Sequence, residues 1–149
     1  MSELLVQIVA ERPRPRLIPL VTSYTGYLVE GTEPGLHRGL PIRFLVKAFG
    51  FAETLVVPGD REGEIVHAEL RWPEGGGIMF GSGEGKFAVQ PGNVALYVVT
   101  DQPDALFERA TAAGAEVVRG LSDEDYGSRG FTVRDPEGNL WSFGTYRGA

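Results

Sequence analysis

The chain has 149 residues, of which 42% are hydrophobic, and a formal net charge of −6. This length suits one domain or two small modules that share a core. The acidic balance disfavours nucleic acids and anionic membranes as partners, and no apolar run approaches the ~20 residues that a membrane-spanning helix needs. Cysteine is absent and histidine occurs only at His37 and His67, so thiolate chemistry and a three-histidine site within one chain are excluded. No secretory signal pattern is present at the N-terminus, so the expected location is the cytoplasm.

Residues 1–16 predict an N-terminal arm. A short apolar run at 4–10 leads into alternating arginine and proline at 12–16, and proline cannot donate to a regular hydrogen-bond ladder. A nucleic-acid-binding tail is the functional alternative, which the acidic chain disfavours. A strand is then expected at residues 18–30, and a loop at residues 31–39.

The pattern after the loop predicts a helix at 41–49 and three strands. Pro41 suits the first turn of a helix, an apolar stripe follows at helical spacing (Ile42, Leu45, Val46, Phe49), and Gly50 suits the residue that closes it. Strands are expected at 51–57, 64–72 and 78–81. Alternation in the second of these places Val66, Ala68, Leu70 and Trp72 on one face, and His67, Glu69 and Arg71 on the other.

The second half repeats this order. A strand is expected at 93–99, and Asp101 as cap with Pro103 predicts a helix at 103–113 that Gly114 stops. A strand at 115–119 and a polar loop at 120–129 follow. The run Asp-Pro-Glu-Gly-Asn at 135–139 then predicts the turn of a hairpin. On its second strand, Trp141 should be buried under a helix and Ser142 should face the other way.

A shift of 64 residues places Gly114 on Gly50 and the final hairpin on residues 66–79. This correspondence predicts an internal duplication of a βαβββ module. The expected organisation is an arm at 1–16, a first module at 17–82, a linker at 83–92 and a second module at 93–149.

The duplicated module with its final Asp-Pro-Glu-Gly-Asn hairpin is similar to the vicinal oxygen chelate superfamily, which includes glyoxalase I, the bleomycin-resistance proteins and the extradiol dioxygenases. The resemblance is most specific at residues 93–98, 112–117 and 126–147. It implies an α+β fold in which two βαβββ modules form a curved mixed sheet with a concave cleft. It also implies a small-molecule ligand and a homodimer.

The first strand of the first module is atypical, because residues 29–35 contain Pro34 and two glycines. Residues 23–41 resemble instead the N-terminal sensory domain of AraC-type regulators. The segment 18–29 is the candidate replacement for the missing strand.

In metal-using members of the superfamily, the ligands come from the first and fourth strands of each module. The matching positions here are Asn93, Ser142 and, through the repeat, Ile78, all poor or impossible ligands for a divalent cation. The fourth position falls in the atypical segment that holds His37. The resemblance therefore favours binding without metal or cofactor, as in the bleomycin-resistance proteins.

The predicted ligand-binding residues combine the polar face of the strand at 64–72, the metal-equivalent positions and aromatic side chains that could stack on a planar ligand. They are His67, Glu69, Arg71, Ile78, Phe80, Asn93, Tyr97, Ser142 and Tyr146. The competing interpretation makes His67, Glu69 and Arg71 a solvated strand edge and the aromatics part of the core.

Two other functions stay open. One is a metal-dependent lyase, isomerase or dioxygenase that recruits His37 or His67 and Glu69 as ligands. The other is a ligand sensor or an inert remnant. The sequence assigns no catalytic residue and names no ligand.

Overall fold

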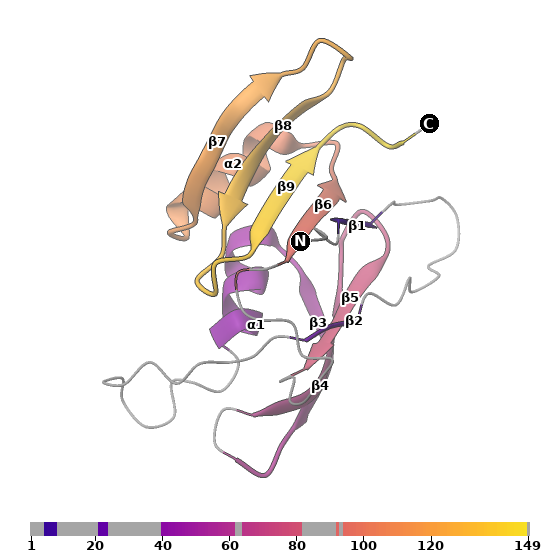
Figure 1. Ribbon diagram of the computed structural model, residues 1–149, viewed down its shortest axis with the longest axis vertical. Helices are drawn as coiled ribbons and strands as arrows, with labels where there is room; N and C mark the ends of the chain where they lie inside the picture. Colours follow the sequence, from indigo (N-terminus) through magenta and orange to yellow (C-terminus); the bar gives the residue numbers. More distant parts are fainter. Residues whose placement is uncertain are drawn as a thin grey trace.

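The computed structural model of the chain describes residues 5–8, 21–23, 40–61, 64–81, 92 and 94–148. Figure 1 shows an upper and a lower sheet, with the longer helix behind the upper one. The upper sheet has the strand order β1-β6-β9-β8-β7 and contains β1 (Leu5–Ile8), β6 (Ala95–Val99), β7 (Glu116–Asp123), β8 (Arg129–Arg134) and β9 (Leu140–Gly144). The lower sheet has the order β2-β5-β4-β3 and contains β2 (Val21–Ser23), β3 (Ala52–Pro58), β4 (Ile65–Arg71) and β5 (Gly77–Gly81).

The helices lie where the sequence predicts them, the first from its apolar stripe and the second from Pro103 and Gly114. α1 (Leu40–Phe44) continues as the π-helical turn η1 (Leu45–Phe49), and α2 spans Pro103–Ala112. The glycines after them, Gly50 and Gly114, have φ of 85° and 90°, the left-handed conformation expected at these helix ends. No helix in the described part of the chain has the length and apolarity needed to cross a membrane.

The two sheets share one topology. In the lower sheet β5 lies between β4, which is antiparallel to it, and β2, which is parallel. In the upper sheet β9 lies in the same way between β8 and β6. This repetition confirms the predicted α+β fold, and β2, inside the segment 18–29, takes the place of the atypical first strand.

Three local predictions are corrected. Residues 5–8 of the predicted arm form β1, which pairs in parallel with β6. Strand β7 runs to Asp123, so the predicted polar loop is much shorter than 120–129. The side chain of Asp101 does not cap α2, whose N-cap residue is Gln102; Asp101 pairs instead with Arg147.

Equivalent residues of the two modules are 64 positions apart at the helix ends but only 63 positions apart at the hairpin turns. In the first module the N–H of Trp72 donates to the carbonyl of Gly76 at 3.0 Å, and in the second the N–H of Asp135 donates to the carbonyl of Asn139 at 3.0 Å. Trp72 therefore corresponds to Asp135. The one-residue difference therefore arises between the helix ends and the hairpin turns.

This offset changes which residues face the core, because a slip of one residue moves every side chain of a strand to the other face. Ser142 corresponds to Met79 rather than to Ile78. Ile78 and Phe80 are each only 2% exposed and pack in the core, next to Leu70 and Ala68 across the sheet. Their predicted place in the ligand cleft is therefore corrected.

A β-bulge explains a second correction. Along β4, His67 pairs with Val57 while Ile65 pairs with Pro58, so Val66 is an extra residue without a partner in the register. Val66 is 60% exposed, and Ile65 is buried in its place. Ala68, Leu70 and Trp72 are buried, as the alternation predicts.

One core joins the two modules. Trp141 is fully buried and its ring lies 5.1 Å from that of Phe49 in η1. The indole N–H of Trp72 donates to the carbonyl of Val99 at 3.1 Å. From α2, the guanidinium of Arg109 donates to two carbonyls of η1, each at 2.8 Å.

Replacing Trp141 with alanine should lower the free energy of unfolding by roughly 3–5 kcal/mol, because the indole fills the centre of the core. Urea unfolding followed by circular dichroism measures this loss. Val118→Ala, at a half-exposed position of β7, serves as the control and should change stability by less than about 0.5 kcal/mol. A loss below about 1 kcal/mol for Trp141→Ala would contradict the packing described above.

Candidate ligand-binding site

The outer face of the upper sheet, opposite the core, carries a mixed set of half-buried side chains. They occupy alternate positions of three neighbouring strands: Ala95, Tyr97, Thr132, Arg134, Leu140 and Ser142. Ser142 lies beside Tyr97 on one side and Thr132 on the other. The hydroxyls of Ser142 and Thr132 are 2.9 Å apart and share a hydrogen bond. The face therefore combines hydroxyls, one guanidinium and aliphatic surface.

The Tyr97 hydroxyl holds the segment that follows β9. It donates to the carbonyl of Tyr146 at 3.0 Å and accepts the N–H of the same residue at 3.1 Å. Burial raises the pKa of Tyr97 above its ordinary value, while hydrogen bonds to Ser128 and Tyr146 oppose that rise. A Cβ at Gly144 would lie 2.7 Å from the Tyr97 hydroxyl oxygen, so glycine is needed for this close approach.

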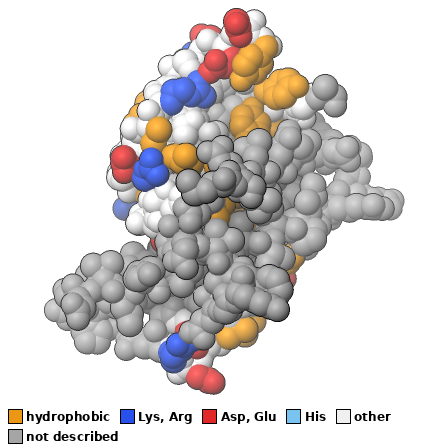
Figure 2. All heavy atoms as spheres, viewed as in Figure 1, with side chains coloured by type: hydrophobic (Ala, Val, Ile, Leu, Met, Phe, Trp, Pro, Cys, Tyr) orange, Lys and Arg blue, Asp and Glu red, His pale blue; other side chains and the backbone are white. Residues whose placement is uncertain are grey.

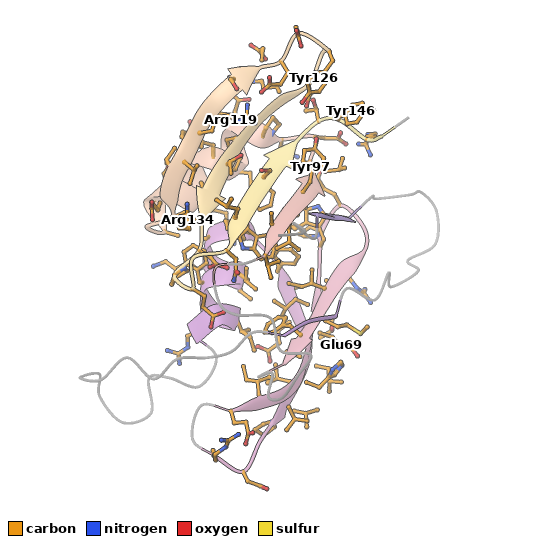
Figure 3. The ribbon with its side chains drawn as sticks, viewed as in Figure 1. Glu69, Tyr97, Arg119, Tyr126, Arg134 and Tyr146 are labelled. Atoms are coloured by element: carbon orange, nitrogen blue, oxygen red, sulfur yellow. The ribbon has the colours of Figure 1, made fainter. Side chains whose placement is uncertain are left out.

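Two arginines lie toward the β7 and β8 side of this face (Figure 3). Arg134 donates to the carbonyl of Gly138 at 2.9 Å, and its Nε is 3.8 Å from a Glu116 carboxylate oxygen. Arg119 donates to the hydroxyl of Ser122 at 2.6 Å and pairs with Glu124. Arg134 therefore has the weaker ion pair and keeps more capacity to bind an acceptor on a ligand.

The outer face of the lower sheet carries the other predicted polar residues. His67 Nε2 is 2.9 Å from the Glu69 carboxylate. In register with this pair lie Leu55 and Val57 of β3 and Met79 of β5. Leu55 and Val57 are 44% and 39% exposed. The polar pair thus lies within an apolar surround.

The structure separates the predicted residues into groups. Tyr97, Ser142 and Tyr146 lie together on the upper sheet, whereas Glu69 lies apart from them on the lower sheet (Figure 3). His67 accompanies Glu69, and Arg71 is exposed at the end of β4. Ile78 and Phe80 belong to the core. Asn93 and His37 lie outside the described residues.

Sequence reasoning missed Thr132, Arg134 and Leu140 on the upper face, and Tyr126 beside it. The first three follow from the hairpin register, because Thr132 pairs with Ser142 and Arg134 with Leu140. Tyr126 carries no such signal in the sequence. It belongs to a turn after β7, and its ring meets that of Tyr146.

The described donor atoms do not fit a divalent cation. Ser142 offers one neutral hydroxyl that is already bonded to Thr132, and its counterpart Met79 offers only a thioether. The described residues contain no cluster of three or more His, Cys, Asp or Glu side chains placed to hold a metal.

A small hollow lies on the other side of the lower sheet. It measures about 180 Å³ and is lined by Ile42, Arg43, Glu53, Val56, Pro58, Glu64 and Ile65. Sites for organic ligands commonly measure roughly 300–1,000 Å³. The hollow is therefore the weaker candidate.

The comparison with known families agrees with the fold described above. Residues 42–143 match the Glyoxalase/Bleomycin resistance protein/Dioxygenase superfamily, and the chain belongs to it. The match begins after residues 23–41, so their resemblance to AraC sensory domains stays a prediction.

Among relatives, the uncharacterized protein Mb0911c of Mycobacterium bovis is 37% identical over 112 residues, which are 69% of this chain and 72% of that protein. The uncharacterized protein Rv0887c of Mycobacterium tuberculosis has the same identity, and the chain covers 65% of its length.

Among solved structures, TioX from Micromonospora sp. ML1 is 31% identical with a TM-score of 0.66, over 87% of this chain and 97% of TioX. A glyoxalase/bleomycin resistance protein from Streptomyces sp. CB03234 is 20% identical with a TM-score of 0.59, over 84% of this chain and 96% of that protein. The second likeness shows the fold alone.

Glu137, in the turn below the site, has an unusual carboxyl group. Its Oε2 is buried and has no hydrogen-bond partner among the described residues. Burial, together with the nearby charge of Asp135, raises the pKa of Glu137 to about 8. The protonated form is therefore favoured in the folded protein.

We expect the wild-type protein to lose stability relative to Glu137→Gln as the pH rises from about 4.5, the ordinary value, to about 8. Below that interval the carboxyl is neutral in both the folded and the unfolded state; above it, folding must bury a charge. The free energy of unfolding of the wild type should fall by about 1–2 kcal/mol relative to the variant. This is less than the full pKa shift of Glu137 implies, because solvent reaches part of the carboxyl group. Urea unfolding of both proteins across this interval measures it, and parallel stability curves would contradict it.

Proposed function

We propose that this protein binds a small organic molecule on the outer face of its upper sheet, without a catalytic metal. The observation that carries the proposal is the hydroxyl pair of Ser142 and Thr132. Within this pair, Ser142 occupies the position where the family resemblance places a metal-binding carboxylate. Hydroxyls can orient polar groups of a ligand through hydrogen bonds but hold a cation weakly.

The surroundings of this pair suit an organic ligand. Tyr97 and Leu140 supply apolar contact, and Arg134 supplies a cationic donor at the edge. Binding sites for small molecules combine apolar walls with a few polar groups that fix orientation. The hydroxyl of Ser142 is bonded to Thr132 rather than to a base, so nothing described activates it as a nucleophile.

The second candidate function is an enzyme. The observation that favours it is the 2.9 Å contact between His67 and Glu69, since a carboxylate that orients an imidazole is a common arrangement for acid–base catalysis. This candidate would be favoured if the protein turned over a substrate and His67→Gln abolished the turnover while ligand binding was retained.

We further propose a cytoplasmic homodimer. Leu55, Val57 and Val66 are exposed apolar residues on the lower sheet, two of them on its edge strand β3, and they could lie at an interface between copies. The absence of cysteine is compatible with a reducing compartment. Light scattering after size-exclusion chromatography tests the oligomeric state.

Titration with a library of small heteroaromatic compounds, followed by amide NMR spectra, tests the proposed site. Bound compounds should shift the resonances of Tyr97, Thr132, Leu140 and Ser142. Ser142→Ala should weaken their binding about fivefold, the value of one hydrogen bond, with little effect on folding. Thr111→Ala, which removes a hydroxyl from helix α2 that bonds to Phe107, is the matched control and should change nothing. Shifts confined to the hollow beside Ile42 would contradict the site.

Metal analysis of protein purified without a histidine tag tests the second part of the proposal. We expect substoichiometric Zn²⁺, Ni²⁺, Mn²⁺ and Fe²⁺, and compound binding that a chelator leaves unchanged. A stoichiometric metal, with an activity that the chelator abolishes, would refute it.

A further inference from the structure

We infer that the ligand of this site is an organic cation, whose ammonium group lies in the corner between the rings of Tyr126 and Tyr146. This inference rests on the proposed function and names the chemical class of the ligand. Three observations carry it: the geometry of the two rings, the contacts that hold them and the charges around them.

The two tyrosine rings are exposed and nearly perpendicular. Their centroids are 5.7 Å apart and their planes meet at 79°. Tyr126 is 64% exposed and Tyr146 is 44% exposed. Figure 2 shows hydrophobic side chains gathered at the upper end of the molecule, beside acidic ones. In this edge-to-face arrangement the edge of one ring lies against the face of the other, and the parts of both ring faces beside this contact border a corner. The negative face of an aromatic ring attracts cations.

Defined contacts hold the corner at the end of the proposed site. Tyr146 is fixed through its main chain by the Tyr97 hydroxyl, which belongs to the outer face. Tyr126 occupies a tight turn in which the N–H of Gly127 donates to the carbonyl of Glu124 at 2.9 Å, and Gly127 has a φ of 85°. The main chain that carries both rings is therefore held before a ligand arrives, so binding has only side chains to order.

The charges on the neighbouring strand ends and loops favour a cation. Arg129 is bound by two carboxylates, Asp104 at 2.8 Å and Asp123 at 3.1 Å. Arg147 pairs with Asp101, and Arg119 pairs with Glu124. These arginines are therefore each neutralised, and Arg129 more than neutralised.

Asp125, next to Tyr126, takes part in none of these ion pairs and is exposed. Five carboxylates thus face three guanidinium groups near the tyrosine corner, and the remaining negative charge attracts cations to it. Arg134, the cationic donor of the proposed site, lies at the other end of the sheet face (Figure 3). An anion would meet this excess and both negative ring faces.

Choline and its uncharged isostere 3,3-dimethylbutan-1-ol test the inference. Each is titrated into the full chain, with the ring resonances of Tyr126 and Tyr146 followed by NMR. Choline should bind at least about fivefold more tightly than the alcohol, because the two molecules have the same shape and only one is a cation.

Three variants locate the effect. Tyr126→Leu should remove the preference for choline, while Tyr126→Phe should keep it because the ring face remains. Tyr97→Phe should weaken choline binding several-fold, because it releases the main chain of Tyr146 without touching the cation. Val118→Ala, at an exposed position of β7, is the control and should bind choline as the wild type does.

Equal affinity for choline and the alcohol, or choline binding that survives Tyr126→Leu, would overturn the inference. If choline fails while neutral heteroaromatic compounds still bind in a Ser142-dependent way, the inference falls and the proposed function stands. If neither class of probe binds the upper sheet, both fall.

Discussion

The buried carboxylate of Asp135 is the interaction on which the geometry of the second module depends. Its Oδ1 accepts the main-chain N–H groups of Glu137 and Asn139, each at 2.9 Å, and its Oδ2 accepts the indole N–H of Trp141 at 2.9 Å. A carboxylate removed from water is costly unless hydrogen bonds replace its hydration. These donors replace it, and they fix the indole toward the core. Ser142, the next residue, must then face outward.

The same turn also sets the strand that carries Tyr97. The side-chain oxygen of Asn139 accepts the N–H groups of Gly92 and Val94, at 3.0 and 3.3 Å, just before β6 begins. β6 therefore enters the sheet in a fixed register with β9, which places Tyr97 beside Ser142. One polar turn thus determines both the packing of the core and the arrangement of the outer face.

The sequence predicted what depends on local pattern and missed what depends on pairing between strands. An apolar stripe located the first helix, Pro103 located the second, and a closing glycine marked the end of each. Alternation placed Trp141 and Ser142 on opposite faces. The bulge at Val66 and the 63-residue offset of the hairpins depend on cross-strand partners, which no local window contains. Because strand faces alternate at every residue, an error of one position was enough to move Ile78 from the core to the predicted cleft.

Tyr126, one of the site residues that the sequence did not predict, shows the same limit at longer range. Its segment reads as a polar loop, and nothing in it reports that the turn returns beside Tyr146. The inward-facing residues of both sheets are constrained by one shared core, whereas the outward-facing ones are constrained only by what they bind. Under the proposed function, poor metal ligands at a few outward positions, Ser142 on β9 among them, suit the site to organic ligands instead of metal ions. A fold of this kind can therefore change its ligand class through a few outward positions while its core stays the same.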